Sequence, residues 1–199
     1  MAPSHQNTRA LLVQAGTTYP KVINLPSHSA EHKVNTIIRA TAYQAIPTYN
    51  PGTSIIEAQS GYSTMLNQNG ILSLRFQDYI YPEMAAHGVT QYSSVTLNLE
   101  TGYNYRFDEL FRPGADYQAR INQIIQAQIS ARQIPMLKPF AGVGSDETYY
   151  LTPDRLVIYY QPYVYTPGYY GILEFAIAYS QISDIINPAG PIGRILPRV

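Results

Sequence analysis

The amino-acid sequence predicts an α+β protein of two small subdomains, in which antiparallel sheets are each packed by an amphipathic helix. Three apolar, aromatic runs between Thr148 and Ile182 are separated by Pro-bearing turns, a pattern typical of consecutive strands. Two other segments, 30–45 and 116–132, place apolar residues three and four positions apart, as amphipathic helices do. These patterns divide the chain into an irregular leader (1–18), an N-terminal α+β subdomain (19–105), a C-terminal α+β subdomain (106–187) and a Pro-rich, irregular tail (188–199).

The strands of the first subdomain follow from its turn signals. A short strand is expected at 19–25, ahead of the first helix. Segments 54–66 and 71–81 flank an Asn-Gln-Asn-Gly sequence at 67–70, which predicts a β-hairpin with Gly where φ becomes positive. Segment 92–99 alternates polar and apolar residues, so a further strand is predicted there.

An extended segment, 103–111, crosses the boundary between the two subdomains and leads into the helix at 116–132. Three strands follow. Their first turn contains Pro153 and Asp154, because Pro presets φ and Asp can hydrogen-bond its own backbone. The second break contains Pro167 and Gly168.

The composition excludes several classes of protein. Charged residues are 13% of the chain, 13 basic against 13 acidic and without a basic cluster, so no nucleic-acid partner is expected. The chain has no cysteine, which excludes disulfides, thiol catalysis and Cys-type zinc sites. The first residues lack an apolar run behind a basic end, so neither a signal peptide nor a membrane span is predicted.

Tyrosine is the unusual component, with 19 Tyr against 5 Phe and no Trp. Tyr favours strands, and a buried Tyr needs a hydrogen-bond partner for its hydroxyl, so we favour sheets with amphipathic faces. A surface that stacks on sugar rings or peptides is the alternative.

The chain contains, in this order, the segments ILSLRFQDYIY (71–81), AHG (86–88), LETGYNYRFDELF (99–111), YYLTPDRLVIYYQPY (149–163) and LEFAIAYSQI (173–182). Together these five segments resemble a bacterial family of unknown biochemical activity. That family forms the outer region of a lysozyme-sensing anti-sigma factor and the non-catalytic part of some peptidoglycan deacetylases. The resemblance covers about 19–187 and implies a two-part α+β body at the cell envelope or outside the cell, without an activity of its own.

His87 is the titratable residue of greatest interest, since an imidazole in a loop can transfer protons or bind a metal. A metal site needs further ligands, and His5, His28 and His32 lie far away in sequence. We therefore favour a structural role, in which His87 hydrogen-bonds the backbone of a turn.

The neighbouring acids Asp108 and Glu109 have the residue type of a glycosidase pair but not its geometry. That mechanism needs two carboxylates that face each other across roughly 5–9 Å, whereas adjacent side chains usually point apart. A role at the start of a helix is preferred, because acids stabilise the positive end of the helix dipole.

The loop between the last two strands carries a group of tyrosines beside Pro and Gly residues. Exposed aromatic residues on a rigid loop can stack on a glycan or anchor a protein partner. The alternative is that alternate tyrosines complete the core of the flanking strands. The predicted binding residues are Tyr163, Tyr165, Tyr169, Tyr170 and His87.

The sequence therefore predicts a non-catalytic binding or sensing module of the bacterial cell-envelope type, whose ligand is a wall glycan or a protein. Two alternatives stay open: a hydrolase that acts on cell-wall material with His87 as acid or base, and a structural protein of a surface or spore layer. No catalytic residue, metal site or cofactor is expected.

Overall fold

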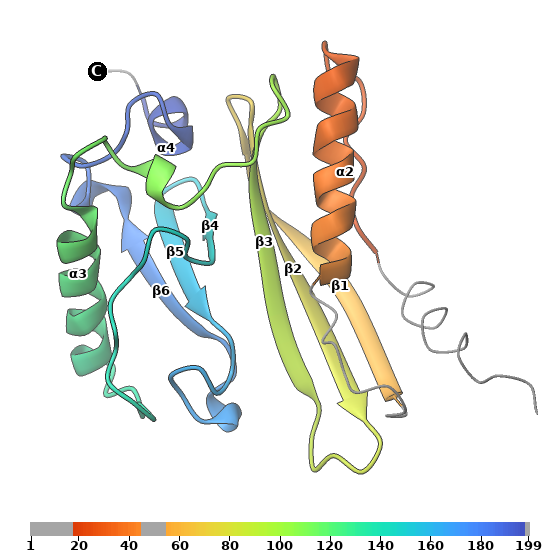
Figure 1. Ribbon diagram of the computed structural model, residues 1–199, viewed down its shortest axis with the longest axis vertical. Coiled ribbons are helices and arrows are strands. Elements are labelled where there is room, and N and C mark those ends of the chain that lie inside the picture. The colour runs from red at the N-terminus through yellow and green to blue at the C-terminus, as the bar shows by residue number, and fades with distance from the viewer. Residues whose placement is uncertain (1–17, 45–54, 198–199) are drawn as a thin grey trace, which may run out of the picture.

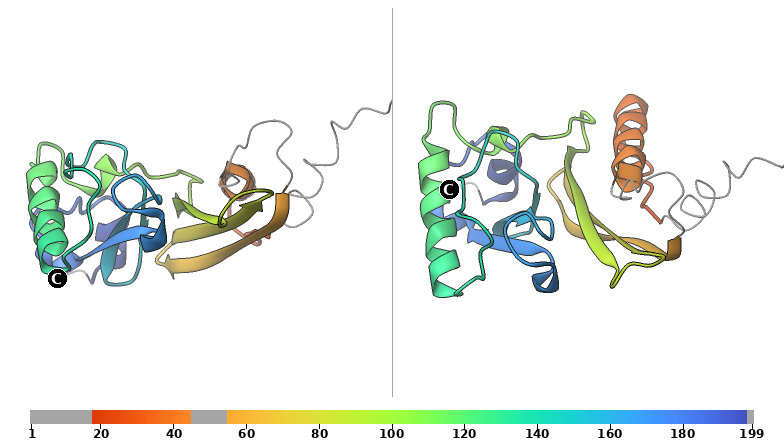
Figure 2. Two further views of the ribbon diagram at one scale, coloured as in Figure 1. Left: turned by 90° about the horizontal axis from the view of Figure 1, so that it is seen from below. Right: turned by 60° about the horizontal axis from the view of Figure 1, so that its bottom comes forward.

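The computed structural model describes residues 18–44 and 55–197 and contains two antiparallel three-stranded sheets, as the predicted α+β fold requires. The elements stack in four layers, helix, sheet, sheet and helix, with the two sheets in the middle (Figures 1 and 2). The predicted leader at 1–18 lies, except for Thr18, outside the described residues.

The first sheet has the order β1-β2-β3, with β1 at Ile55–Gln68, β2 at Ile71–Pro82 and β3 at Val89–Asn98. The predicted hairpin is confirmed: Asn69 and Gly70 have φ of 50° and 75°, as a tight turn between twisted strands requires. Helix α2 (His28–Gln44) covers one face of this sheet (Figure 1). The core between them contains Val34, Ile38, Ala42, Leu72, Leu74, Phe76, Val95 and Leu97.

The predicted strand at 19–25 is wrong, because this segment is irregular and lies along α2. The side chain of Asn35 on α2 takes the place of a strand partner: its Oδ1 accepts from Val22 N and its Nδ2 donates to Val22 O, both at 2.8 Å. Val22 still packs against the first core. The segment thus contributes apolar side chains to the core, but its backbone is hydrogen-bonded by a side chain and not by a neighbouring strand.

The second sheet has the order β4-β5-β6, with β4 at Tyr149–Leu151, β5 at Arg155–Tyr160 and β6 at Leu173–Ala178. These are the three strands predicted in the aromatic stretch. Helix α3 (Tyr117–Ala131) begins where its sequence predicts, since Asp116 accepts from Ala119 N at 3.1 Å and caps it. Ile121, Ile125 and Ile129 on α3 are buried in the core against this sheet.

The tail at 188–199 was expected to be irregular, but the structure contains helix α4 at Pro191–Ile195. Pro191 stands at the start of the helix, where its missing N–H costs no hydrogen bond. Ile192 and Ile195 are buried in the second core, and Arg194 lies 2.7 Å from Glu100. A short apolar helix therefore closes the end of the fold.

The two sheets pack face to face and share side chains. Tyr150, Val157 and Tyr159 of the second sheet form a small buried cluster, against which Met65 and Tyr92 of the first sheet pack. The larger second core also takes in residues of the hairpin end in the first half, Leu66 and Ile71. This packing brings the loops of both halves together at one end of the sheets.

Candidate binding surface

Two loops from different halves of the chain meet at a hydrogen bond. The β2–β3 loop (83–88) carries His87, and the β5–β6 loop (161–172) carries Tyr163. The Tyr163 hydroxyl lies 3.1 Å from His87 Nε2, and Nδ1 of the same ring lies 3.0 Å from the Gly88 carbonyl oxygen. Residues 76 positions apart in the sequence are thus adjacent in space.

The β5–β6 loop is fixed at its start to the neighbouring sheet. The side chain of Gln161 forms two hydrogen bonds with Tyr92 of β3, one to each backbone polar group, at 3.0 and 2.6 Å. Tyr163 has a φ of 68°, and its N–H donates to Thr166 O at 3.0 Å. A left-handed conformation is unfavourable for a tyrosine, so the surrounding loop must impose it.

Gly168 allows the Tyr163 ring to lie where it does. A Cβ added at Gly168 would stand 2.2 Å from Cζ of that ring and 2.1 Å from its hydroxyl oxygen, closer than any side chain permits. The glycine that was interpreted as a turn signal therefore also sets the position of the hydroxyl that contacts His87.

The loop surface, defined as Met84, His87, Tyr163 and Tyr169, is strongly exposed. Met84 is 99% exposed at a φ of 63°, Tyr169 is 82% exposed and Tyr163 is 54% exposed. Large apolar side chains usually avoid such exposure, and rigid exposed aromatic residues are common at binding surfaces.

The structure places the other two predicted tyrosines elsewhere. Tyr165 is 7% exposed and lies in the second core, with its ring 4.9 Å from the Tyr160 ring. Tyr165 is therefore a core residue and not a surface binding residue. This agrees with the alternative prediction, in which some of the loop tyrosines complete the core. Tyr170 is half-buried, and its hydroxyl accepts from Arg132 Nη2 at 3.0 Å, which holds the base of the loop.

His87 has few polar neighbours with which to act on a substrate. Its hydrogen-bond partners among the described residues are the Tyr163 hydroxyl and the Gly88 carbonyl. Within 18–44 and 55–197, no group of three or more His, Asp or Glu side chains could hold a metal ion. The Tyr163 contact was not predicted, since the sequence analysis had given His87 a backbone partner.

Asp108 and Glu109 lie at the start of a helical turn, as predicted, although the turn is a short 3₁₀-helix (Asp108–Leu110). Asp108 pairs with Arg106 at 3.0 Å, and Glu109 accepts from Arg106 N at 2.7 Å and from the Tyr103 hydroxyl at 2.6 Å. The bond to Glu109 raises the pKa of Tyr103. Both carboxylates line a surface hollow of about 450 Å³ beside Tyr105 and Tyr117.

Sequence reasoning missed the polar cluster between the sheets, which consists of Arg75, Tyr92, Tyr150 and Glu174. Arg75 Cζ lies 4.4 Å from the centre of the Tyr92 ring and 5.6 Å from that of Tyr150. The Tyr150 hydroxyl donates to Glu174 Oε1 at 3.0 Å. The available signal was an Arg within the apolar run of β2, on the face that α2 does not cover.

Comparison with known proteins agrees with the fold. Residues 108–180 match the family described as protein of unknown function (DUF3298). The DUF3298 match contains the β5–β6 loop with Tyr163 and Tyr169, whereas His87 lies ahead of it. The predicted resemblance to a family of unknown activity is thus confirmed.

A curated relative extends the likeness to most of the chain. Anti-sigma-V factor RsiV of Bacillus subtilis (strain 168) is 25% identical over 184 residues, which are 84% of this chain and 63% of that protein. The chain thus spans less than two thirds of that relative. The predicted resemblance to an anti-sigma factor is confirmed, while the deacetylase connection stays a prediction.

Two solved structures share the fold. A DUF3298 family protein from Pseudomonas aeruginosa PAO1 has a TM-score of 0.60 at 16% identity, covering 84% of this chain and 82% of that one. A DUF3298 family member from Bacteroides fragilis NCTC 9343 has a TM-score of 0.55 at 16% identity, covering 83% and 67%. Among the described residues, no helix combines the length and apolar character needed to cross a bilayer.

Proposed function

We propose that this chain is a non-catalytic binding or sensing module of the bacterial cell envelope, which binds a protein ligand at the loop surface. The similarity to an anti-sigma factor over 84% of the chain supports a sensing role. The observation that carries the proposal is the exposure of Met84, Tyr163 and Tyr169 on two loops joined by the His87 contact.

The loop surface is organised before any ligand arrives. The Tyr163 ring is held by its contact with His87 and by the space that Gly168 leaves open. Gln161 fixes the loop to β3 through two hydrogen bonds. Fixing these side chains in the free protein reduces the entropy lost on binding, so affinity increases without further contacts.

The side chains favour a protein over a glycan. Met84 is almost fully exposed, and a flexible thioether adapts to the irregular apolar surface of a protein. Tyrosine supplies large contact area and dominates protein binding sites. A wall glycan, which stacks on tyrosine but gains little from methionine, is the second ligand class and is separated by the experiment.

The experiment measures binding to two purified probes by biolayer interferometry. Lysozyme is the protein probe, because the resemblance to a lysozyme-sensing anti-sigma region suggests it, and soluble peptidoglycan fragments are the glycan probe. We expect the chain to bind the protein probe, and Tyr163→Ala and Tyr169→Ala each to weaken that binding about tenfold, equivalent to roughly 1.4 kcal/mol for a hot-spot residue.

The matched control is Tyr103→Ala, since Tyr103 is 47% exposed but lies outside the loop surface. Its binding should equal that of the unmodified chain. Binding to peptidoglycan fragments with the same sensitivity to Tyr163 and Tyr169 would assign the ligand to the glycan class. Binding of neither probe, or equal binding by all variants, would contradict the proposal.

A further inference from the structure

The two sheets have four edge strands, β1, β3, β4 and β6, and three of them are blocked by side chains. An edge strand exposes backbone N–H and C=O groups, which can pair with a strand of another molecule. Proteins usually cover or blunt such edges. The way each edge is covered therefore indicates where this chain can form a further sheet contact.

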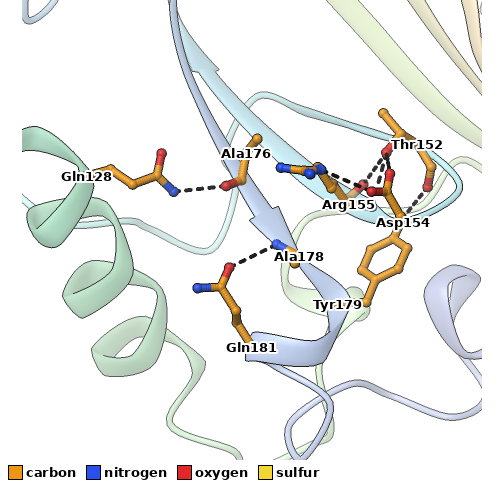
Figure 3. Close-up of polar contacts among 8 residues, drawn as sticks. All are labelled: Gln128, Thr152, Asp154, Arg155, Ala176, Ala178, Tyr179 and Gln181. Carbon is orange, nitrogen blue, oxygen red and sulfur yellow. Dashed lines mark hydrogen bonds and ion pairs between the residues drawn. The ribbon is translucent and has the colours of Figure 1, made fainter. Parts of the chain in front are cut away.

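Side chains hydrogen-bond to the outer edge of β6 (Figure 3). Gln128 Nε2 on α3 donates to Ala176 O at 2.9 Å. Gln181 Oε1 accepts from Ala178 N at 3.0 Å. Arg132 donates a further bond of 2.7 Å to a β6 carbonyl, so this edge is occupied.

The edges of β3 and β4 are occupied in the same way. Gln161 bonds both backbone groups of Tyr92 on β3. Ser73 on the other sheet accepts from Leu151 N on β4 at 3.0 Å, and Ser94 donates to a second β4 backbone group. Each of these three edges thus has hydrogen-bond partners within the chain.

The register shows which groups of β1 point outward. The backbone N–H and C=O of Tyr92 on β3 point away from β2, so Tyr92 and its partner Gln77 on β2 form a non-hydrogen-bonded pair. The backbone groups of Gln77 therefore point to the other side, toward its β1 partner Gly61. Gly61 is therefore bonded to β2, and its neighbours Ser60 and Tyr62 direct their backbone groups outward. Among the described residues, these outward groups have no backbone partner.

Strand β1 lacks the usual protection of an edge. It is 14 residues long, contains one charged residue, Glu57, and has neither Lys nor Pro. Within the described part of the chain, a Cβ added at Gly61 would meet nothing within 4 Å, so packing against these residues does not require the glycine. Glycine within a strand often marks the close approach of another backbone.

We propose that β1 pairs antiparallel with β1 of a second copy of the chain, with the two Gly61 residues opposite each other at the two-fold axis. The outward groups of Ser60 then bond those of the partner's Tyr62, and Gly61 occupies the close non-hydrogen-bonded pair. Glu57 lies four positions from the axis, opposite an uncharged part of the partner strand, so like charges do not meet. The β1-β2-β3 sheets of the two copies then join into one sheet of six strands.

Cross-linking tests this arrangement directly, because the full chain contains no cysteine. The proposed pair brings the two Gly61 Cα atoms to about 4.5 Å, a separation that a disulfide can span. Gly61→Cys has room for its side chain and should form a disulfide-linked dimer under mild oxidation. Tyr169→Cys is the control, since it is 82% exposed but on the loop surface.

A second variant tests the hydrogen bonds without a new thiol. Ala58 shares the outward alternation of Ser60, so Ala58→Pro removes an outward N–H and leaves the β1–β2 ladder intact. Sedimentation equilibrium should show a dimer for the unmodified chain and for Tyr169→Ala, and a monomer for Ala58→Pro with an unchanged circular dichroism spectrum. A monomeric unmodified chain, or cross-linking of Gly61→Cys no faster than that of Tyr169→Cys, overturns the proposal. Neither result would bear on the ligand binding proposed for the loop surface, which the interferometry experiment tests separately.

Discussion

The guanidinium group of Arg75 on β2 lies 3.5 Å from the carboxylate of Glu174 on β6, and this pair connects the inner faces of the two sheets. The Tyr92 ring lies against the guanidinium, and the Tyr150 hydroxyl donates to the carboxylate. The Arg75 side chain is 19% exposed and that of Glu174 is 35% exposed. Because both charges are partly shielded from water, they interact more strongly than a pair on the open surface.

We expect Arg75→Met to lower the free energy of unfolding by about 1–3 kcal/mol, because it removes the cation–π contacts and leaves Glu174 without its cation. Methionine keeps much of the apolar volume, so the loss reports on the charge. Urea denaturation followed by circular dichroism measures the effect.

The control for this prediction is Arg155→Met, which breaks the exposed pair of Arg155 with Asp154. Exposed pairs contribute little, so the unfolding curve should stay within experimental error of the original. Equal losses in the two variants would show that the contact between the sheets has no special energetic role.

The buried tyrosines predict a loss of stability at alkaline pH. Burial raises the pKa of Tyr150 and of Tyr159 to about 12, from 10.0. Above pH 10 the unfolded chain loses these phenolic protons while the folded chain keeps them, so ionisation favours the unfolded state. The ionisation of these two tyrosines should therefore leave stability unchanged below pH 10 and should lower it between about pH 10 and pH 12.

Urea denaturation at pH 9 and pH 11 tests this prediction, with Tyr159→Phe as the comparison. Tyr159→Phe removes one ionising group, so its stability should fall less between the two pH values. The variant also loses the hydrogen bond to Ser94, which lowers its stability at both pH values alike. A pH dependence identical to that of the unmodified chain would show that Tyr159 does not titrate as its burial requires.

Tyr165 and Tyr169 lie four positions apart and should differ in what they stabilise. Tyr165→Ala creates a cavity beside Tyr160 and Phe140 and should cost about 3 kcal/mol of unfolding free energy. Tyr169→Ala should change it by less than about 0.5 kcal/mol, because the ring is 82% exposed. Thermal denaturation of both variants measures the difference, and similar melting temperatures would contradict the assignment of Tyr165 to the core.

The regular elements could be predicted because their determinants are local. The turn at Asn69 and Gly70 sets the register of the hairpin through its own backbone angles. Asp116 caps α3 by accepting a hydrogen bond from the N–H of Ala119, three residues further along the chain. Signals of this kind operate within one turn or one hairpin, so the order and type of most elements can be read from short windows of sequence.

The candidate site could be predicted only in part, because it forms when the sheets pack. His87 and Tyr163 were both selected from the sequence, but no spacing indicated that residues 76 positions apart would share a hydrogen bond. Likewise, alternation in β2 places Arg75 on the face away from α2, and it does not reveal that a second sheet covers that face. Alternation also leaves open which tyrosine of a loop turns inward, so Tyr165 was included wrongly among the surface residues.

The last prediction concerns Asp78, a carboxylate on β2 that is 2% exposed. Ser60 donates a hydrogen bond to its Oδ1, while Oδ2 has no hydrogen-bond partner within the described part of the chain. Burial raises the pKa of Asp78 above 3.8. The folded state therefore binds the proton of the Asp78 carboxyl group more tightly than the unfolded state does. As pH rises from 3.8 through the pKa of the folded state, ionisation of Asp78 lowers the free energy of unfolding.

Asp78→Asn removes the buried charge and keeps the shape of the side chain. We expect it to raise the free energy of unfolding at pH 7 by about 1 kcal/mol, because an uncharged amide costs less to bury than a carboxylate. As pH falls through the raised pKa of Asp78 the difference should shrink, since protonation then removes the buried charge. Asp184→Asn, at a side chain that is 58% exposed, is the control and should not stabilise the protein at pH 7. A lower stability of Asp78→Asn at pH 7 would show that the carboxylate is needed in its charged form.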